Sequence, residues 1–132
     1  MKNIRRIEVL RAIYVLCLLG ATSTHVIAVI NHGIFWDYGG VSRASAMFWT
    51  SLTVIDPLVV VLLLTRRNAG ILATMILIVV DVLHNLWIVQ QFSPPLLSGI
   101  SHAPAVMAQI AFMIFVFATV VFAWERPTSS IS

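Results

Sequence analysis

Two acidic residues, Asp56 and Asp81, lie inside long apolar stretches of the sequence. A charged side chain at the centre of a bilayer costs at least roughly 2.5–3.5 kcal/mol to insert, so an acid retained there is a functional candidate. Two carboxyl groups close together in a low dielectric cannot both stay ionised without a counter-charge. Because these stretches contain no Lys or Arg, we expect a proton, a protonated histidine, a metal ion or a cationic ligand to compensate them.

Other polar side chains are placed around these acids at helical spacing. Asp81, His84 and Asn85 stand at i, i+3 and i+4, which puts them on one face of a helix. On the preceding apolar stretch, polar positions follow steps of three or four residues up to Asp56. The candidate residues of a ligand-binding pocket, all polar or aromatic, are Asp56, Asp81, His84, Asn85, His25, Thr53 and Trp49.

Four apolar stretches must hold these residues. Each has about 20 residues, the length that a helix needs to cross a hydrocarbon core of about 30 Å. They run approximately over 12–30, 44–64, 71–89 and 103–123, and short loops join them. The sequence therefore predicts an all-α integral membrane protein with one domain, an antiparallel four-helix bundle, and a disordered tail over 127–132.

The composition excludes a water-soluble fold. Hydrophobic residues make up 60% of the 132 residues and charged residues 10%, with a mean hydropathy of +0.99, whereas soluble domains are roughly 45–50% apolar and about 25% charged. Lipid is the expected solvent, and the net charge of +3 indicates attraction to anionic lipid without a nucleic-acid partner. The single cysteine, Cys17, excludes a dithiol oxidoreductase and a thiolate metal cluster.

The basic residues predict an orientation, because Lys and Arg near helix ends are retained on the cytoplasmic face. Arg43 is the only basic residue on one side of the bundle. The other seven flank the opposite side: Lys2, Arg5, Arg6, Arg11, Arg66, Arg67 and Arg126. We expect both termini in the cytoplasm and the protein in the plasma membrane. An alternative is that the first stretch is a signal peptide cleaved before Val29, which would leave three spans.

The polar residues within the spans also divide by depth. Nearly all lie in the outer half of the membrane, and the inner half is almost wholly apolar. A channel would need polar lining on both sides of the midplane. The pattern predicts a pocket that opens outward and has Asp56 and Asp81 as its floor.

Three classes of function remain open. The first is binding of a cation, a proton or a small lipid-soluble ligand, including a membrane enzyme in which Asp81 and His84 transfer protons. The second is a membrane anchor subunit that binds haem or quinone, with His25 and His84 as axial haem ligands. The third is a structural or accessory subunit, in which buried polar groups only join helices, within an oligomer or beside a partner membrane subunit.

Overall fold

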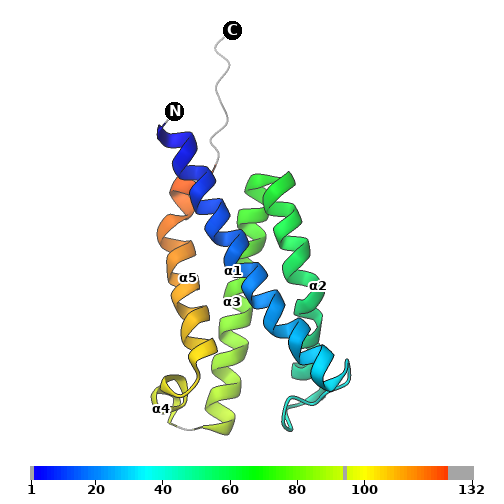
Figure 1. Ribbon diagram of the computed structural model, residues 1–132. Helices are drawn as coiled ribbons and strands as arrows, with labels where there is room; N and C mark the ends of the chain where they lie inside the picture. Colours follow the sequence, from blue (N-terminus) through cyan, green and yellow to red (C-terminus); the bar gives the residue numbers. More distant parts are fainter. Residues whose placement is uncertain (1, 94, 125–132) are drawn as a thin grey trace.

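The computed structural model describes residues 2–93 and 95–124, and over these residues the secondary structure is all helical (Figure 1). The helices are α1 (Lys2–His32), α2 (Arg43–Thr65), α3 (Arg67–Phe92), α4 (Leu96–Ser101) and α5 (Pro104–Ala123). Within this described part, all but the short α4 are long and apolar enough to span a membrane. Large apolar side chains stay exposed along each of these four helices, as expected for an integral membrane protein surrounded by lipid.

The helices extend past several predicted limits. Helix α1 begins ten residues before residue 12, because its basic first turns are good helix formers although they are not apolar. A single residue, Arg66, separates α2 from α3, where the sequence indicated a longer turn. Helix α4 occupies a segment for which only a loop was expected. The predicted tail over 127–132 lies outside the described residues.

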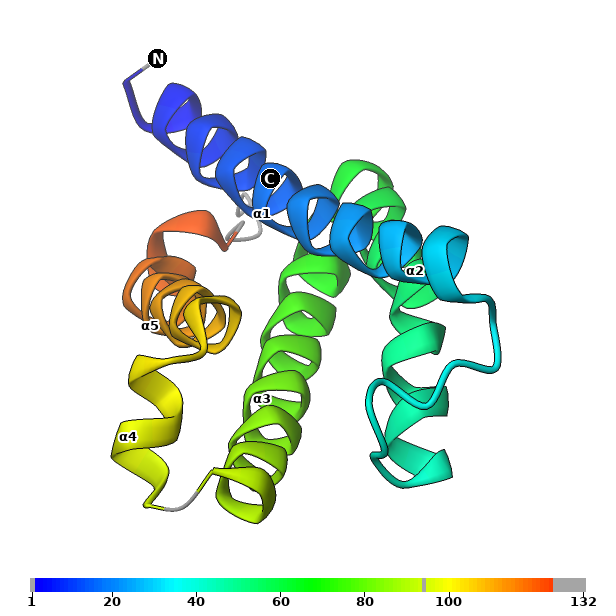
Figure 2. The same cartoon turned by 60° about the horizontal axis from the view of Figure 1, so that its bottom comes forward.

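Helix α1 is tilted across the other helices. Its N-terminal half lies near the C-terminal end of α5, and its C-terminal half lies against α2 (Figures 1 and 2). Helix α3 contacts both α2 and α5, so the four long helices form a closed ring of contacts. Because of the tilt, α1 and α5 are close at one end of the bundle and separated at the other.

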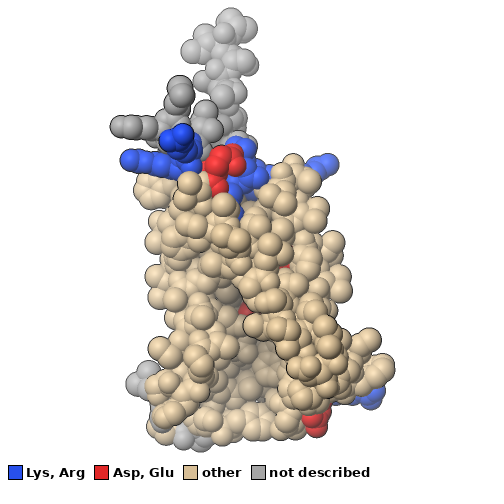
Figure 3. All heavy atoms as spheres, in the orientation of Figure 1, with Lys and Arg blue, Asp and Glu red and all other residues tan. Residues whose placement is uncertain are grey.

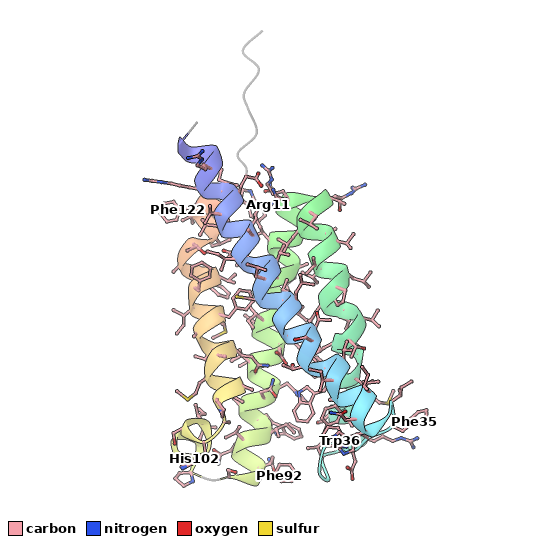
Figure 4. The ribbon with its side chains drawn as sticks, in the orientation of Figure 1. Arg11, Phe35, Trp36, Phe92, His102 and Phe122 are labelled. Atoms are coloured by element: carbon pink, nitrogen blue, oxygen red, sulfur yellow. The ribbon has the colours of Figure 1, made fainter. Side chains whose placement is uncertain are left out.

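The end where α1 and α5 meet carries most of the basic side chains (Figure 3), and we call it the basic end, defined by Arg5, Arg6, Arg11, Arg66 and Arg67. Here the Arg11 guanidinium donates to both carboxylate oxygens of Glu8, at 3.1 and 3.2 Å, and to the Leu63 carbonyl of α2. Glu8 also accepts from Arg67 of α3, at 2.9 Å. These contacts join α1 to the α2–α3 connection (Figure 4).

A packed apolar core lies directly below this network. Its fully buried Tyr14 places its hydroxyl 2.7 Å from Thr119 Oγ1 and donates to the Val116 carbonyl at 3.2 Å, so it fastens α1 to α5. The buried members of the core are Tyr14, Leu18, Val59, Val60, Leu63, Ile71, Val116 and Ala123. The bundle is therefore closely packed at the basic end, and open space lies toward the opposite end, which we call the loop end (residues 33–42 and the α3–α5 connection).

Candidate functional site

A cavity of about 620 Å³ lies between α1, α2, α3 and α5. This volume is in the range of pockets that hold small organic ligands, about 300–1,000 Å³. Most of the wall is apolar. The lining includes five residues of the predicted set: His25, Trp49, Asp56, Asp81 and Asn85.

Asp56 is the least compensated group in the wall. It is 3% exposed and lies at least about 14 Å from either end of α2, directly before Pro57. Within the described residues its carboxyl group has no hydrogen-bond partner, and Asp81, a second acid, lines the same cavity. Buried polar groups are ordinarily hydrogen-bonded, so an acid left without a bond in a cavity wall is a ligand-binding candidate.

Asn85 connects three of the helices around the cavity. Its amide nitrogen donates to Asp81 Oδ1 at 2.8 Å and to Gln109 Oε1 of α5 at 3.1 Å. Its amide oxygen accepts from Trp49 Nε1 of α2, also at 3.1 Å. Asn85 therefore orients the Asp81 carboxylate and holds the Trp49 ring against the cavity.

His84 and Thr53 are not among the lining residues. Residues i+3 and i+4 from Asp81 are separated by about 100° around the helix, so when Asn85 faces the cavity, His84 is directed toward α2. There its Nε2 lies 3.0 Å from Ser45 Oγ, and its ring packs on Phe48. The Thr53 hydroxyl donates to the Thr50 carbonyl of its own helix, at 2.7 Å.

The two histidines of the haem alternative therefore have different surroundings. His25 faces the cavity, and His84 is hydrogen-bonded to Ser45. A haem held by both would require His84 to give up that bond and turn toward α1. In residues 2–93 and 95–124, no group of three or more His, Cys, Asp or Glu side chains is placed to hold a metal ion.

Aromatic side chains cover the cavity at the loop end. The loop over 33–42 turns back through residues with positive φ, among them Tyr38 at 51° and Gly39 at 85°. The Trp36 ring stacks on His32 with centroids 3.9 Å apart, and Tyr38 lies between Trp36 and Trp49, at 4.3 and 5.1 Å. Trp36 lies under the end of α1 in Figure 4, and both it and Tyr38 line the cavity.

Only some of the residues that line the cavity could be predicted from sequence patterns. Gln109 is one more polar residue in the outer half of its span, but nothing in its spacing indicates a bond to Asn85. The position of Trp36 near the end of a span is typical of a tryptophan at the membrane interface, and it does not indicate that the ring lines the cavity. The glycine and alanine residues that line the cavity on α1 and α5 have no polar side chain, so residue type alone could not predict them as part of a site.

Comparisons of the chain with protein-family models, with curated proteins and with solved structures give no match.

Proposed function

We propose that the four long helices cross the plasma membrane as an antiparallel bundle with both termini on the cytoplasmic side. The basic end supports this orientation, because most of the basic side chains gather there (Figure 3), whereas Arg43 begins α2 at the loop end. In this arrangement Asp56 and Asp81 are near the midplane, and the cavity extends from about this level toward the outer face of the membrane.

Within this cavity the protein binds a small organic cation, an apolar molecule with a protonated amine. The observation that carries the proposal is Asp56, a residue only 3% exposed whose carboxyl group lines the cavity and has no hydrogen-bond partner among the described residues. The cavity lining contains no Lys or Arg to neutralise it. An ammonium group would supply the missing charge and the missing donors.

The rest of the wall suits the same ligand. The rings of Trp36, Tyr38 and Trp49 lie at one end of the cavity, where they can pack on the apolar part of the ligand. The apolar wall can hold the hydrocarbon part of the ligand. Joining of helices by polar contacts explains Asn85, whose partners come from three helices, but it does not explain Asp56.

Equilibrium binding in lipid nanodiscs tests the proposal. The probe is a dansyl-labelled long-chain primary amine, and binding is followed by energy transfer from tryptophan to the dansyl group. We expect saturable binding that is weakened at least about tenfold in Asp56→Asn. The acetylated probe, which has no charge, is expected to bind weakly and equally to both proteins.

Asp37→Asn is the matched control, because Asp37 is exposed in the loop and an Asn side chain can still accept from the Gly39 amide. Its affinity for the amine is expected to equal that of the unmodified protein. Equal affinity of the amine for Asp56→Asn and the unmodified protein would overturn the proposal. The absence of saturable binding would overturn it as well and would favour the accessory-subunit alternative.

A further inference from the structure

The cavity lining differs in exposure from one side to another. Asp56, Asp81 and Asn85 are buried and form its back wall on α2 and α3. The exposed lining residues all belong to the two helices that diverge, α1 and α5. They are Cys17, Gly20, Thr24, Ala105 and Ala108. The cavity is therefore open along its side, between α1 and α5.

Both ends of the cavity are covered. At the basic end, Tyr14 joins α1 to α5 within the packed core. At the loop end, the half-buried rings of Trp36 and Tyr38 lie with their centroids 4.3 Å apart and line the cavity. The polarity of the sequence predicted a pocket that opens outward, but the exposed lining residues lie at the side, and none of them belongs to the loop over 33–42.

The side opening runs from the first turn of α5, where Ala105 lies, to the depth of the hydrocarbon at Gly20. Gly20 is fifteen residues from Arg5 and twelve from His32 in the apolar span of α1, so it is about 18 Å from the nearer end. Figure 3 shows the hollow on the face that α1 and α5 share, with acidic atoms visible in the middle of an otherwise uncharged surface. At the level of Gly20, a ligand in this opening contacts lipid chains before it contacts bulk water.

From this geometry we infer that the ligand enters sideways from the bilayer, between α1 and α5, and is therefore a membrane-dissolved amphiphilic amine and not a water-soluble cation. This inference rests on the proposed function, because it concerns access to the same Asp56 site. Amphiphilic amines lie at the membrane interface with their hydrocarbon parts in the core. Such a molecule can slide through the opening with its amine directed at Asp56 and keep its chain in lipid.

Gly20 offers a way to narrow the opening without disturbing the fold. A Cβ atom added there would have no atom of another residue within 4 Å, apart from its own helix and chain neighbours. Leu at this position adds bulk to the rim and favours the helix more than Gly does. Gly20→Ala is the matched control, because it gives a similar gain in helix propensity with little added bulk. Ala108→Leu narrows the opposite rim.

Stopped-flow measurements with the dansyl-labelled amine, in nanodiscs, test the route. We expect Gly20→Leu and Ala108→Leu to slow association and dissociation of the probe by about fivefold or more, with Kd changed by less than about threefold. Gly20→Ala is expected to keep the rates of the unmodified protein. Trp36→Ala removes part of the aromatic cover at the loop end and one ring of the binding wall, so it is expected to speed dissociation and to leave association within about twofold.

The opposite pattern would overturn the inference. If Trp36→Ala accelerates association several-fold and the two Leu variants leave the rates unchanged, the ligand enters from water at the loop end. In that case a weakened affinity of Asp56→Asn would still support the proposed function. If the charged and acetylated probes bind equally well, the proposed function itself fails, whichever route the rates indicate.

Discussion

Replacing Asp56 by Asn distinguishes a binding role from a helix-joining role, because the two roles predict opposite changes in stability. An acid at the centre of a membrane helix costs about 2.5–3.5 kcal/mol on insertion scales. Hydrogen bonds between membrane helices contribute about 0.6 kcal/mol on average and at most about 1.7 kcal/mol. Asp56 is 3% exposed and has no such bond within the described residues, so the substitution removes the cost and loses no contact.

We therefore expect Asp56→Asn, which keeps a polar amide, to raise the free energy of unfolding by about 1 kcal/mol in the absence of ligand. Asp56→Leu removes the polar group entirely and is expected to raise the free energy of unfolding by about 2–3 kcal/mol. Thermal denaturation in detergent at neutral pH, followed by tryptophan fluorescence, measures the effect. For a chain of this length 1 kcal/mol corresponds to about 3–5 °C in Tm.

Asp37→Asn again serves as the control. Its free energy of unfolding is expected to stay within about 0.5 kcal/mol of that of the unmodified protein, as is usual for substitutions at exposed positions. A Tm for Asp56→Asn several degrees below that of the unmodified protein would refute the reasoning. It would mean that the carboxyl group stabilises the bundle through contacts that the structure does not contain.

Further substitutions test how the helices pack on one another. Asn85→Ala is expected to lower the free energy of unfolding by about 2 kcal/mol in equilibrium denaturation, because the amide joins three helices; an unchanged value would contradict its connecting role. Gly70→Ala is expected to lower the free energy of unfolding by at least about 2 kcal/mol, since the added Cβ would overlap the α2 backbone. Gly20→Ala is expected to raise it by up to about 1 kcal/mol. Equal melting temperatures of the two variants would contradict this difference. Tyr14→Phe is expected to lower the free energy of unfolding by about 0.6–1.7 kcal/mol. In a double-mutant cycle with Thr119→Val, the effects of the two substitutions on this free energy should not be additive.

The four long helices could be predicted from the sequence, because length and apolarity are properties of each segment alone. Their limits were less predictable. A count of apolar residues stops at the first charges, whereas helical hydrogen bonding continues through the basic first turns of α1. Helix α4 is only six residues long, too short for periodicity to reveal.

Within the candidate site, the sequence was informative about single helices and uninformative about their neighbours. Asp81 and Asn85 stand at i and i+4, so their contact follows from helix geometry alone, and the structure has it at 2.8 Å. His84 belongs to the same sequence pattern, but its surroundings depend on which helix packs on its side of α3. That helix is α2, and Ser45 binds the His84 ring there.

The side opening depends on the tilt of α1, which no property of a single segment determines. Small residues such as Gly20, Ala105 and Ala108 commonly mark places where membrane helices approach closely. Here they border a gap, because the large side chains Tyr14 and Arg11 hold α1 against its neighbours at the basic end, and α1 then diverges from α5 toward α2. Tilt is set by packing against the other helices, and in this bundle the tilt leaves the cavity open along its side, between α1 and α5. The same Asp56 on an untilted bundle would be enclosed, and a ligand could then reach it only through the aromatic cover at the loop end.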